Sequence, residues 1–294
     1  MKSILKYSFI LLFIASGCMV NAQIPKSEKQ YLIEFFKGTI GEQWQNTWNL
    51  KADPSSWYGV EINDGHVVGL KLYRNNLSGK IPSGIAVLKN LKSLNLSFNT
   101  LAGNLPKDIF ELGTLKSLRL EMNKLSGALP QDYSKMKNLE DLSLFNNLFQ
   151  GAIPSGIGEL ENLKALNLSS NYLEGRLPKS IEKLANLERL ELFGNKLTGP
   201  IEVDLGKLIN LRELILSYNE FEGDLPSSMA TLSNLEFVQL QGNDFRSLNS
   251  LLRMQSQNLT IFDCDDEFLN MKFGNHEAIK PCLVDTKLED VKRN

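Results

Sequence analysis

The chain repeats itself every 24 residues without an insertion, and this period constrains the fold more than any other feature. A Leu-x-Leu pair recurs in each repeat, and its leading position is occupied by Leu70, Leu94, Leu118, Leu142, Leu166, Leu190, Leu214 and Val238. Apolar residues two positions apart predict a strand with one buried face. Because one such strand cannot bury that face alone, successive repeats must stack. The period therefore predicts a solenoid with a parallel sheet along one side.

A column of asparagines stands five residues after the leading position of each repeat, at Asn75, Asn99, Asn123, Asn147, Asn171, Asn195, Asn219 and Asn243. An unpaired buried amide costs about 1–3 kcal/mol, so this column predicts a structural ladder of hydrogen bonds to the backbone. Glycine follows in seven repeats, from Gly79 to Gly223, and allows a tight bend. An apolar residue and a proline, as at Ile81-Pro82, then predict a convex segment of limited freedom.

These columns together resemble the plant-type leucine-rich repeat of 24 residues, LxxLxLxxNxLxGxIPxxxxxLxx. The resemblance covers eight repeats over residues 67–258, and a partial ninth begins at Leu259. It implies an α/β-type solenoid: a right-handed superhelix with a parallel concave β-sheet, a helical N-terminal cap and an irregular C-terminal cap. In the eighth repeat, Asn249-Ser250 replaces the apolar residue and proline, as expected where a cap begins.

Residues 23–66 are expected to form the N-terminal cap. Ser27-x-x-Gln30 matches a capping box at the start of a helix. The segment from Trp57 is similar to the N-terminal cap of plant receptor ectodomains. Ser55 and Ile62 stand where that family carries cysteines, which favours a bacterial member over a plant one.

Residues 259–294 are expected to hold the partial ninth repeat and the C-terminal cap. Cys264 and Cys282 are the two cysteines that remain after loss of the leader, and an exported compartment permits their pairing. A disulfide between them would contribute about 3 kcal/mol to the stability of the cap.

Residues 1–22 match a secretory signal peptide. Lys2 and Lys6 precede an apolar segment, and small residues ending at Ala22 offer a cleavage site. As an alternative, the sequence before Cys18 resembles a bacterial lipobox, in which that cysteine would be acylated. A leader ending in Ala-Gln also resembles those of secreted Bacteroidetes proteins. Both alternatives predict a secreted or cell-envelope-exposed protein with no transmembrane segment.

Catalytic and metal-binding patterns are absent from the sequence. The two histidines, His66 and His276, lie at opposite ends of the repeat array, and no HExxH, paired CxxC, P-loop or GxSxG pattern occurs. The acidic run at residues 263–267 lacks the glycine and the spacing of an EF-hand loop. A formal net charge of −2 without a long basic run argues against a nucleic-acid partner. We therefore expect a binding protein, not an enzyme, with no cofactor and no metal.

The exposed positions of the expected concave sheet form the candidate ligand-binding face. Their charge changes along the solenoid, from net +4 over the first three repeats through −2 over the next three to −4 over the last. Exposed aromatic and arginine side chains are what protein interfaces use. The candidate ligand-binding residues are Lys71, Tyr73, Arg74, Phe98, Arg119, Phe145, Phe193 and Tyr218.

The resemblance to plant receptor ectodomains implies that a monomer recognises a protein or peptide on the concave face. Inhibition of a secreted polysaccharide-degrading enzyme is an alternative, since polygalacturonase inhibitors share this repeat class. A carbohydrate- or ice-binding surface protein is another. Ice binding would favour a regular ladder of one residue type, whereas the column after the leading leucine begins with Lys71, Asn95, Arg119 and Ser143.

Overall fold

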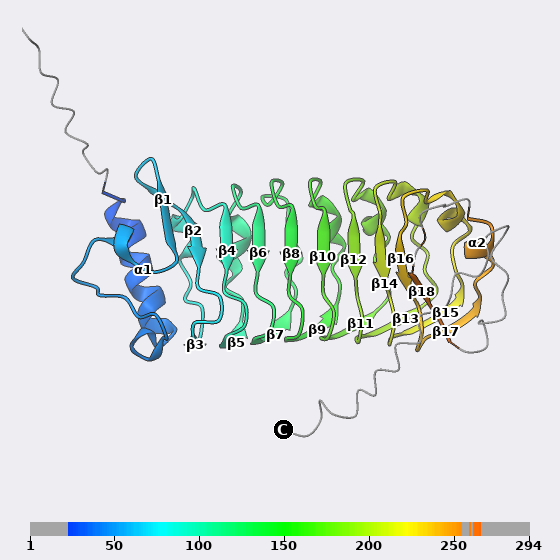
Figure 1. Ribbon diagram of the computed structural model, residues 1–294, viewed down its shortest axis with the longest axis horizontal. Coiled ribbons are helices and arrows are strands. Elements are labelled where there is room, and N and C mark those ends of the chain that lie inside the picture. Colours follow the sequence, from blue (N-terminus) through cyan, green and yellow to red (C-terminus); the bar gives the residue numbers. More distant parts are fainter. Residues whose placement is uncertain (1–22, 255–258, 260, 266–294) are drawn as a thin grey trace, which may run out of the picture.

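The structure is a computed structural model that describes residues 23–254, 259 and 261–265. In these residues the chain forms a solenoid of stacked coils that starts at a helix, as the blue-to-orange progression in Figure 1 shows. The expected α/β leucine-rich-repeat architecture is thus confirmed, including the helix at the N-terminal end.

A ten-stranded sheet, here called the main sheet, runs the length of the solenoid (Figure 1). Its first pair, β1 and β2, is antiparallel. All later neighbours are parallel and pair residues one repeat apart, as Leu94 pairs with Leu118. The strands, in spatial order, are β1 (Val60–Asn63), β2 (His66–Lys71), β4 (Ser93–Asn95), β6 (Ser117–Arg119), β8 (Asp141–Ser143), β10 (Ala165–Asn167), β12 (Arg189–Glu191), β14 (Glu213–Ile215), β16 (Phe237–Gln239) and β18 (Ile261–Asp263).

A second sheet of eight parallel strands, not foreseen from the sequence, lies along one flank and forms the lower edge of Figure 1. The recurring glycine predicts a tight bend, but these glycines lie inside or at the end of the second-sheet strands with positive φ, as Gly103 does at 81°. The strands are β3 (Ser78–Gly79), β5 (Thr100–Asn104), β7 (Lys124–Ala128), β9 (Leu148–Ala152), β11 (Tyr172–Gly175), β13 (Lys196–Gly199), β15 (Glu220–Asp224) and β17 (Asp244–Ser247).

The return segment of most coils contains a short 3-10 helix. These helices are η3 (Ile85–Val87), η4 (Lys107–Glu111), η5 (Ser155–Glu159), η6 (Lys179–Lys183), η7 (Leu205–Lys207) and η8 (Ser227–Thr231), and the eighth coil has the helix α2 (Asn249–Leu252). The third coil has no helix at this place. There Tyr133 stands in the column that Ile85 and Ile109 occupy, and its buried ring packs edge-on against Phe110 at 5.4 Å between ring centroids.

The leucine columns form one continuous core. Leu70, Leu94, Leu166 and their equivalents are fully buried, as are the leucines two positions later. Burying such a side chain stabilises the fold by about 1.5–3 kcal/mol. The core explains why coils stack without interruption through the described repeats.

The N-terminal cap is built on α1 (Lys26–Gly38), with the short helices η1 (Gly41–Gln43) and η2 (Pro54–Ser56) following it. The expected capping box is wrong, because α1 starts after Pro25, has no side-chain cap, and Gln30 donates instead to Glu34 at 3.0 Å. Pro25 itself is extended, with φ −52° and ψ 143°, and its carbonyl accepts a hydrogen bond from the N–H of Lys29 in the first turn at 3.1 Å. Trp48 stacks on Trp57 at 4.8 Å between centroids, and both close the first coil.

A buried carboxylate ties this cap to the main sheet. Glu28 of α1 is 3% exposed and accepts a hydrogen bond from the backbone N–H of Val67 at 2.8 Å. Its other oxygen lies 2.7 Å from Nδ1 of His66. His66 therefore has a structural partner in the cap.

At the other end, Cys264 is buried directly after β18. Cys282, the leader with Cys18, and His276 lie outside the described residues, so the Cys264–Cys282 disulfide stays a prediction. In the described part of the chain, no helix has the length and apolar character needed to span a membrane.

Candidate binding face

The asparagine column holds the main sheet in register. The amide nitrogen of Asn147 donates to the carbonyls of Leu120 and Leu144 at 3.0 and 3.1 Å, and its oxygen accepts from the N–H of Leu125 at 3.0 Å. One side chain thus bonds its own coil and the coil before it. Asn99, Asn123, Asn171, Asn195, Asn219 and Asn243 repeat this arrangement. Asn75, in the first coil, accepts instead from the backbone of Asn46 in the cap at 2.7 Å.

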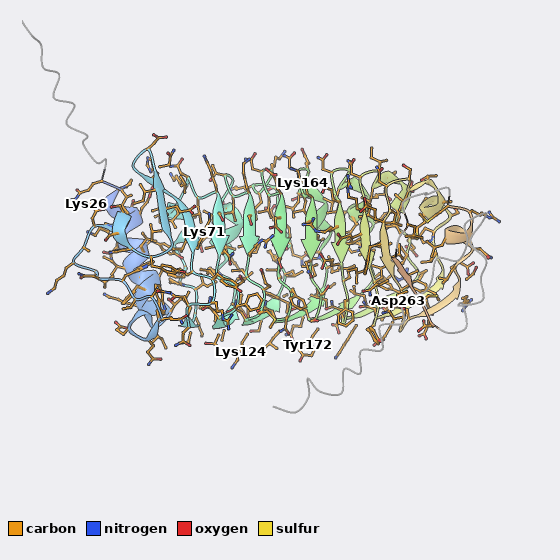
Figure 2. All side chains as sticks on the ribbon, in the orientation of Figure 1. Lys26, Lys71, Lys124, Lys164, Tyr172 and Asp263 are labelled. Atoms are coloured by element: carbon orange, nitrogen blue, oxygen red, sulfur yellow. The ribbon has the colours of Figure 1, made fainter. Side chains whose placement is uncertain are left out.

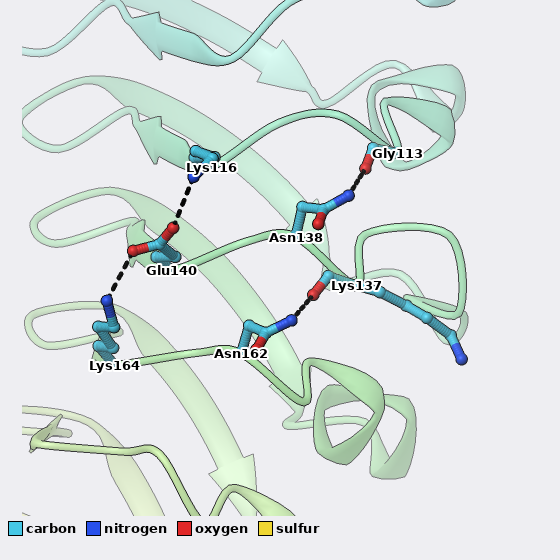
Figure 3. A network of polar contacts seen from close by, with 7 residues as sticks. All are labelled: Gly113, Lys116, Lys137, Asn138, Glu140, Asn162 and Lys164. Atoms are coloured by element: carbon cyan, nitrogen blue, oxygen red, sulfur yellow. Dashed lines mark hydrogen bonds and ion pairs between the residues drawn. The ribbon is translucent and has the colours of Figure 1, made fainter.

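A second amide ladder precedes the main sheet, and sequence reasoning missed it. Asn138 donates to the carbonyl of Gly113 at 2.7 Å and Asn162 to that of Lys137 at 2.8 Å (Figure 3). Asn186, Asn210 and Asn234 continue the series in later coils. The signal was present, because an asparagine recurs at this position of the 24-residue period. Both ends of β8, β10, β12, β14 and β16 are therefore fixed before any ligand arrives.

A column of left-handed residues lies between the main sheet and the second sheet. Arg74, Phe98 and Tyr218 have φ of 47°, 56° and 56°, and the equivalent residues of the other coils also have positive φ. Such a conformation costs a non-glycine residue about 1–2 kcal/mol. The turn places these three exposed side chains at the edge of the main sheet.

Two aromatic pairs with the same geometry stand at this edge. Tyr73 and Phe98 meet edge-on at 5.2 Å between centroids, and Phe193 and Tyr218 do so at 5.3 Å, five coils further along. Tyr73, Phe98 and Tyr218 are each more than 40% exposed. A cavity of about 500 Å³ adjoins the first pair and is lined by Gln45, Arg74, Asn76, Phe98, Asn99 and Thr100.

The other two candidate aromatic side chains are less exposed to a ligand than expected from the sequence. Phe145 and Phe193 are half-buried, so they do not form a column of fully exposed anchors. Of the candidate residues, the first coils bring together Tyr73, Arg74 and Phe98, whereas Tyr218 belongs to the distant second pair.

Ion pairs between neighbouring strands engage two of the three candidate cations. Lys71 contacts Glu61 at 2.7 Å, and Arg119 donates from Nε to Asp141 at 2.6 Å, a bond that raises the pKa of the guanidinium. Arg74 has no recorded ion pair within the described residues, and it is the candidate cation left for a ligand.

The middle of the same face carries an alternating ladder. Glu140 bridges Lys116 at 3.1 Å and Lys164 at 2.8 Å, as the dashed lines of Figure 3 show. The two ammonium groups lower the pKa of the Glu140 carboxyl. Arg212 and Glu236 form a similar contact at 2.8 Å near the far end. These pairs are solvent-exposed, so each contributes little to stability and is screened by salt.

Two acids of the main sheet have a raised pKa among the described residues, Glu191 of β12 and Asp263 of β18. For Glu191, burial is the main cause, and the nearby Glu213 adds to it, while a hydrogen bond from Asn167 at 2.6 Å opposes it. A raised folded-state pKa means that this group contributes stability below its unfolded pKa and loses it as pH rises through the folded value.

We expect Glu191→Gln to raise the free energy of unfolding at pH 7, by less than about 1 kcal/mol because the site is partly solvated. The gain should disappear below about pH 4, where the glutamate of the unfolded chain is also protonated. Urea unfolding at both pH values measures the difference. An equal effect at both would show that the charge of Glu191 is irrelevant to stability.

No metal centre accompanies this face in the described ranges, where no group of three or more His, Cys, Asp or Glu side chains could hold an ion. The face provides a surface for binding: a sheet held by hydrogen bonds, an edge with two aromatic pairs, and a cavity beside the first pair.

Comparison with known proteins agrees with this description. The leucine-rich-repeat family matches residues 151–197 in one form, and residues 90–112, 138–160 and 210–232 in another. The chain resembles the Arabidopsis receptor kinase HAESA in complex with the peptide hormone IDA and the co-receptor SERK1, with 28% identity, a TM-score of 0.65, and coverage of 82% of this chain and 46% of that one.

Two further solved structures are similar. The leucine-rich-repeat ectodomain of GASSHO1/SCHENGEN3 from Arabidopsis thaliana, in complex with CASPARIAN STRIP INTEGRITY FACTOR 2, shares 27% identity at a TM-score of 0.66, over 80% of this chain and 32% of that one. A leucine-rich-repeat protein of Leptospira interrogans shares 33% identity at a TM-score of 0.52, over 65% and 48%. This chain spans less than half the length of each of the three. It therefore contains leucine-rich repeats in a solenoid similar to plant receptor ectodomains.

Proposed function

We propose that this chain is a secreted or cell-surface module that binds a protein or an extended peptide along the main-sheet face. The observation that carries the proposal is the exposed Tyr73–Phe98 pair beside Arg74 and a cavity of about 500 Å³, on a sheet fixed by two amide ladders. Exposed aromatics next to an arginine are typical anchors of interfaces. Two of the similar structures, by their own descriptions, hold a peptide hormone and an integrity factor.

The proposal also covers the subclass of the repeat, which is the plant type, and the location of the protein outside the cytoplasm. The period of 24 residues supports the plant-type repeat, and residues 1–22 support export, either by cleavage after Ala22 or by acylation of Cys18. The absence of cap cysteines at Ser55 and Ile62 supports a bacterial source. In the exported protein, Cys264 is expected to form a disulfide with Cys282.

The spacing of the two aromatic pairs sets the size of ligand that could reach both. They lie five coils apart, which at about 4.8 Å per strand is roughly 24 Å. An extended chain covers about 3.4 Å per residue, so a peptide of about seven residues spans that distance. Arg74, which lies at the first pair, favours an acidic group at that end of the ligand.

We expect the double variant Tyr73→Ala with Phe98→Ala to weaken ligand binding by about 2 kcal/mol, or roughly 30-fold, because buried aromatic anchors dominate interface energies. The ligand is a peptide selected on the purified chain from a random displayed library, and calorimetric titration measures its affinity. The variant should unfold at the same denaturant concentration as the original chain, since both side chains are exposed.

Ile209→Ala is the matched control, because Ile209 is an apolar residue of the return segment with 63% exposure. It should leave the affinity unchanged. Full affinity in the Tyr73 and Phe98 double variant, with loss in the Ile209 variant, would place the site away from the main sheet and refute the proposal.

A further inference from the structure

The outer row of the second sheet carries an apolar centre between opposite charges. The first residues of successive strands are Thr100, Lys124, Leu148, Tyr172, Lys196, Glu220 and Asp244, and all are exposed. The residue after each of them is buried, so this row faces outward from the flank. Leu148 is 42% and Tyr172 51% exposed, so two large apolar side chains stand side by side in this row.

When the row is read in the opposite direction about Tyr172, its charged and apolar residues face suitable partners. Leu148 and Lys196 lie one coil to either side, Lys124 and Glu220 lie two coils away, and the neutral Thr100 and the acidic Asp244 lie three coils away. A two-fold axis through Tyr172 would place each residue opposite the other member of its pair. Lys124 would then meet Glu220 twice, once on each side of the axis.

We propose that a second copy of this chain docks on this flank in an antiparallel, two-fold arrangement centred on Tyr172. Within one chain the ammonium of Lys196 lies over the ring of Tyr172, 5.7 Å from its centroid. In the dimer, Tyr172 would pack on its copy through the remaining ring surface, and the methylene stem of Lys196 would cover Leu148. Neither Lys124 nor Glu220 has a recorded ion pair in the part of the chain that the structure describes, so both charges are available to a partner.

The regular spacing of the coils makes the match possible. Both amide ladders repeat in successive coils, so residues two coils before and after Tyr172 are equivalently placed. Figure 2 shows Lys124 and Tyr172 along the same edge of the solenoid. Glu174 would also lie near its own copy at the axis, and Lys196, which is its register partner on the adjacent strand β13, places a positive charge nearby.

The contact is narrow, so we expect association in the micromolar range or weaker, as for small transient interfaces. A monomer is expected from the sequence. The sequence does not reveal the second sheet or the residues that face outward from it, so this surface could not be considered there. This inference concerns a different surface from the proposed peptide-binding face, and ligand-free protein suffices to test it.

Sedimentation equilibrium of the mature chain, up to about 500 µM, should show a monomer–dimer equilibrium. Lys124→Glu and Glu220→Lys should each weaken it about tenfold or more, because a two-fold dimer turns two attractive contacts into repulsive ones. An equimolar mixture of the two single variants should regain the original affinity, since in the mixed dimer each altered charge meets an opposite one. The combined variant should regain it as well.

Two controls separate this surface from general charge and hydrophobic effects. Lys183→Glu makes the same charge change as Lys124→Glu on the exposed turn η6, and it should leave dimerisation unaltered. Tyr172→Glu should abolish dimerisation, whereas Ile209→Glu, which places a charge on another exposed apolar residue, should leave it unaltered. Monomeric original protein at the highest concentration would overturn the inference. Failure of the mixed variants to recover, or equal loss in the Lys183 variant, would overturn it too.

Discussion

Replacing Asn147 by alanine is expected to lower the free energy of unfolding by about 3 kcal/mol, which is a large part of the stability of an ordinary domain. The side chain donates to the carbonyls of Leu120 and Leu144 and accepts from the N–H of Leu125. Asn147 is 4% exposed, so alanine would leave these backbone groups buried without their side-chain partner. The cost is therefore at the upper end for a lost polar side chain.

Asn138→Ala is the matched comparison, because Asn138 is also an asparagine of a ladder but is exposed and makes one bond to Gly113 at 2.7 Å. It should cost about 1 kcal/mol. Urea unfolding followed by circular dichroism measures both. An unchanged midpoint for the Asn147 variant would refute the ladder as a source of stability.

The position of Asn147 in the fourth coil also affects cooperativity. Each coil of a solenoid contacts only its neighbours, so a weak coil in the middle uncouples the two halves. We expect the Asn147 variant to unfold over a broader range of urea concentration, with a smaller apparent m-value. The Asn138 variant should keep the original slope.

The main sheet could be predicted from the sequence because its signal is long and repeated. Leucines such as Leu94 and Leu118 alternate with polar residues at a fixed period, and each must be buried against its equivalent in the next coil. The second sheet could not be predicted with the same ease. Each of its glycine-containing strands carries its glycine inside or at the end, as β7 carries Gly127, and in the sequence such a glycine indicates a turn.

The sequence identified which residues belong to the candidate binding face, but it did not predict their exposure or their ion-pair partners. Tyr73 and Phe145 occupy the same column, yet Tyr73 is exposed and Phe145 is half-buried. Phe145 has Glu121 and Ser169 as its neighbours in this column, whereas Tyr73 meets Phe98 of the next coil edge-on. Lys71 and Arg119 looked free in the sequence because their partners, Glu61 and Asp141, lie in neighbouring strands.

Gly156→Ala should be the most damaging single change to the return side of the solenoid, with an expected loss of about 3 kcal/mol of unfolding free energy. Most coils carry a side chain at this position, as Asp108 and Ser180 do. In the fourth coil, a Cβ on residue 156 would lie 2.0 Å from the carbonyl oxygen of Gln131. That oxygen belongs to backbone, so relief requires the third coil to move.

The reason for this close approach lies in the third coil. Its return segment has no 3-10 helix, and the ring of Tyr133 replaces the isoleucine of other coils in the core. The N–H of Tyr133 also contacts the carboxylate of Glu159 in the fourth coil at 3.2 Å. The irregular segment therefore rests against η5, and only a residue without a side chain fits beneath it.

Gly151→Ala separates this steric effect from the general cost of replacing a glycine. Gly151 has φ of 79° but no atom within 4 Å of the added Cβ, so its variant should lose only about 1 kcal/mol through backbone strain. Parallel urea titrations of the two variants give the comparison. If Gly156→Ala proves no worse than Gly151→Ala, the third coil does not press on the fourth, and Tyr133 must be accommodated by a shift toward Phe110 instead.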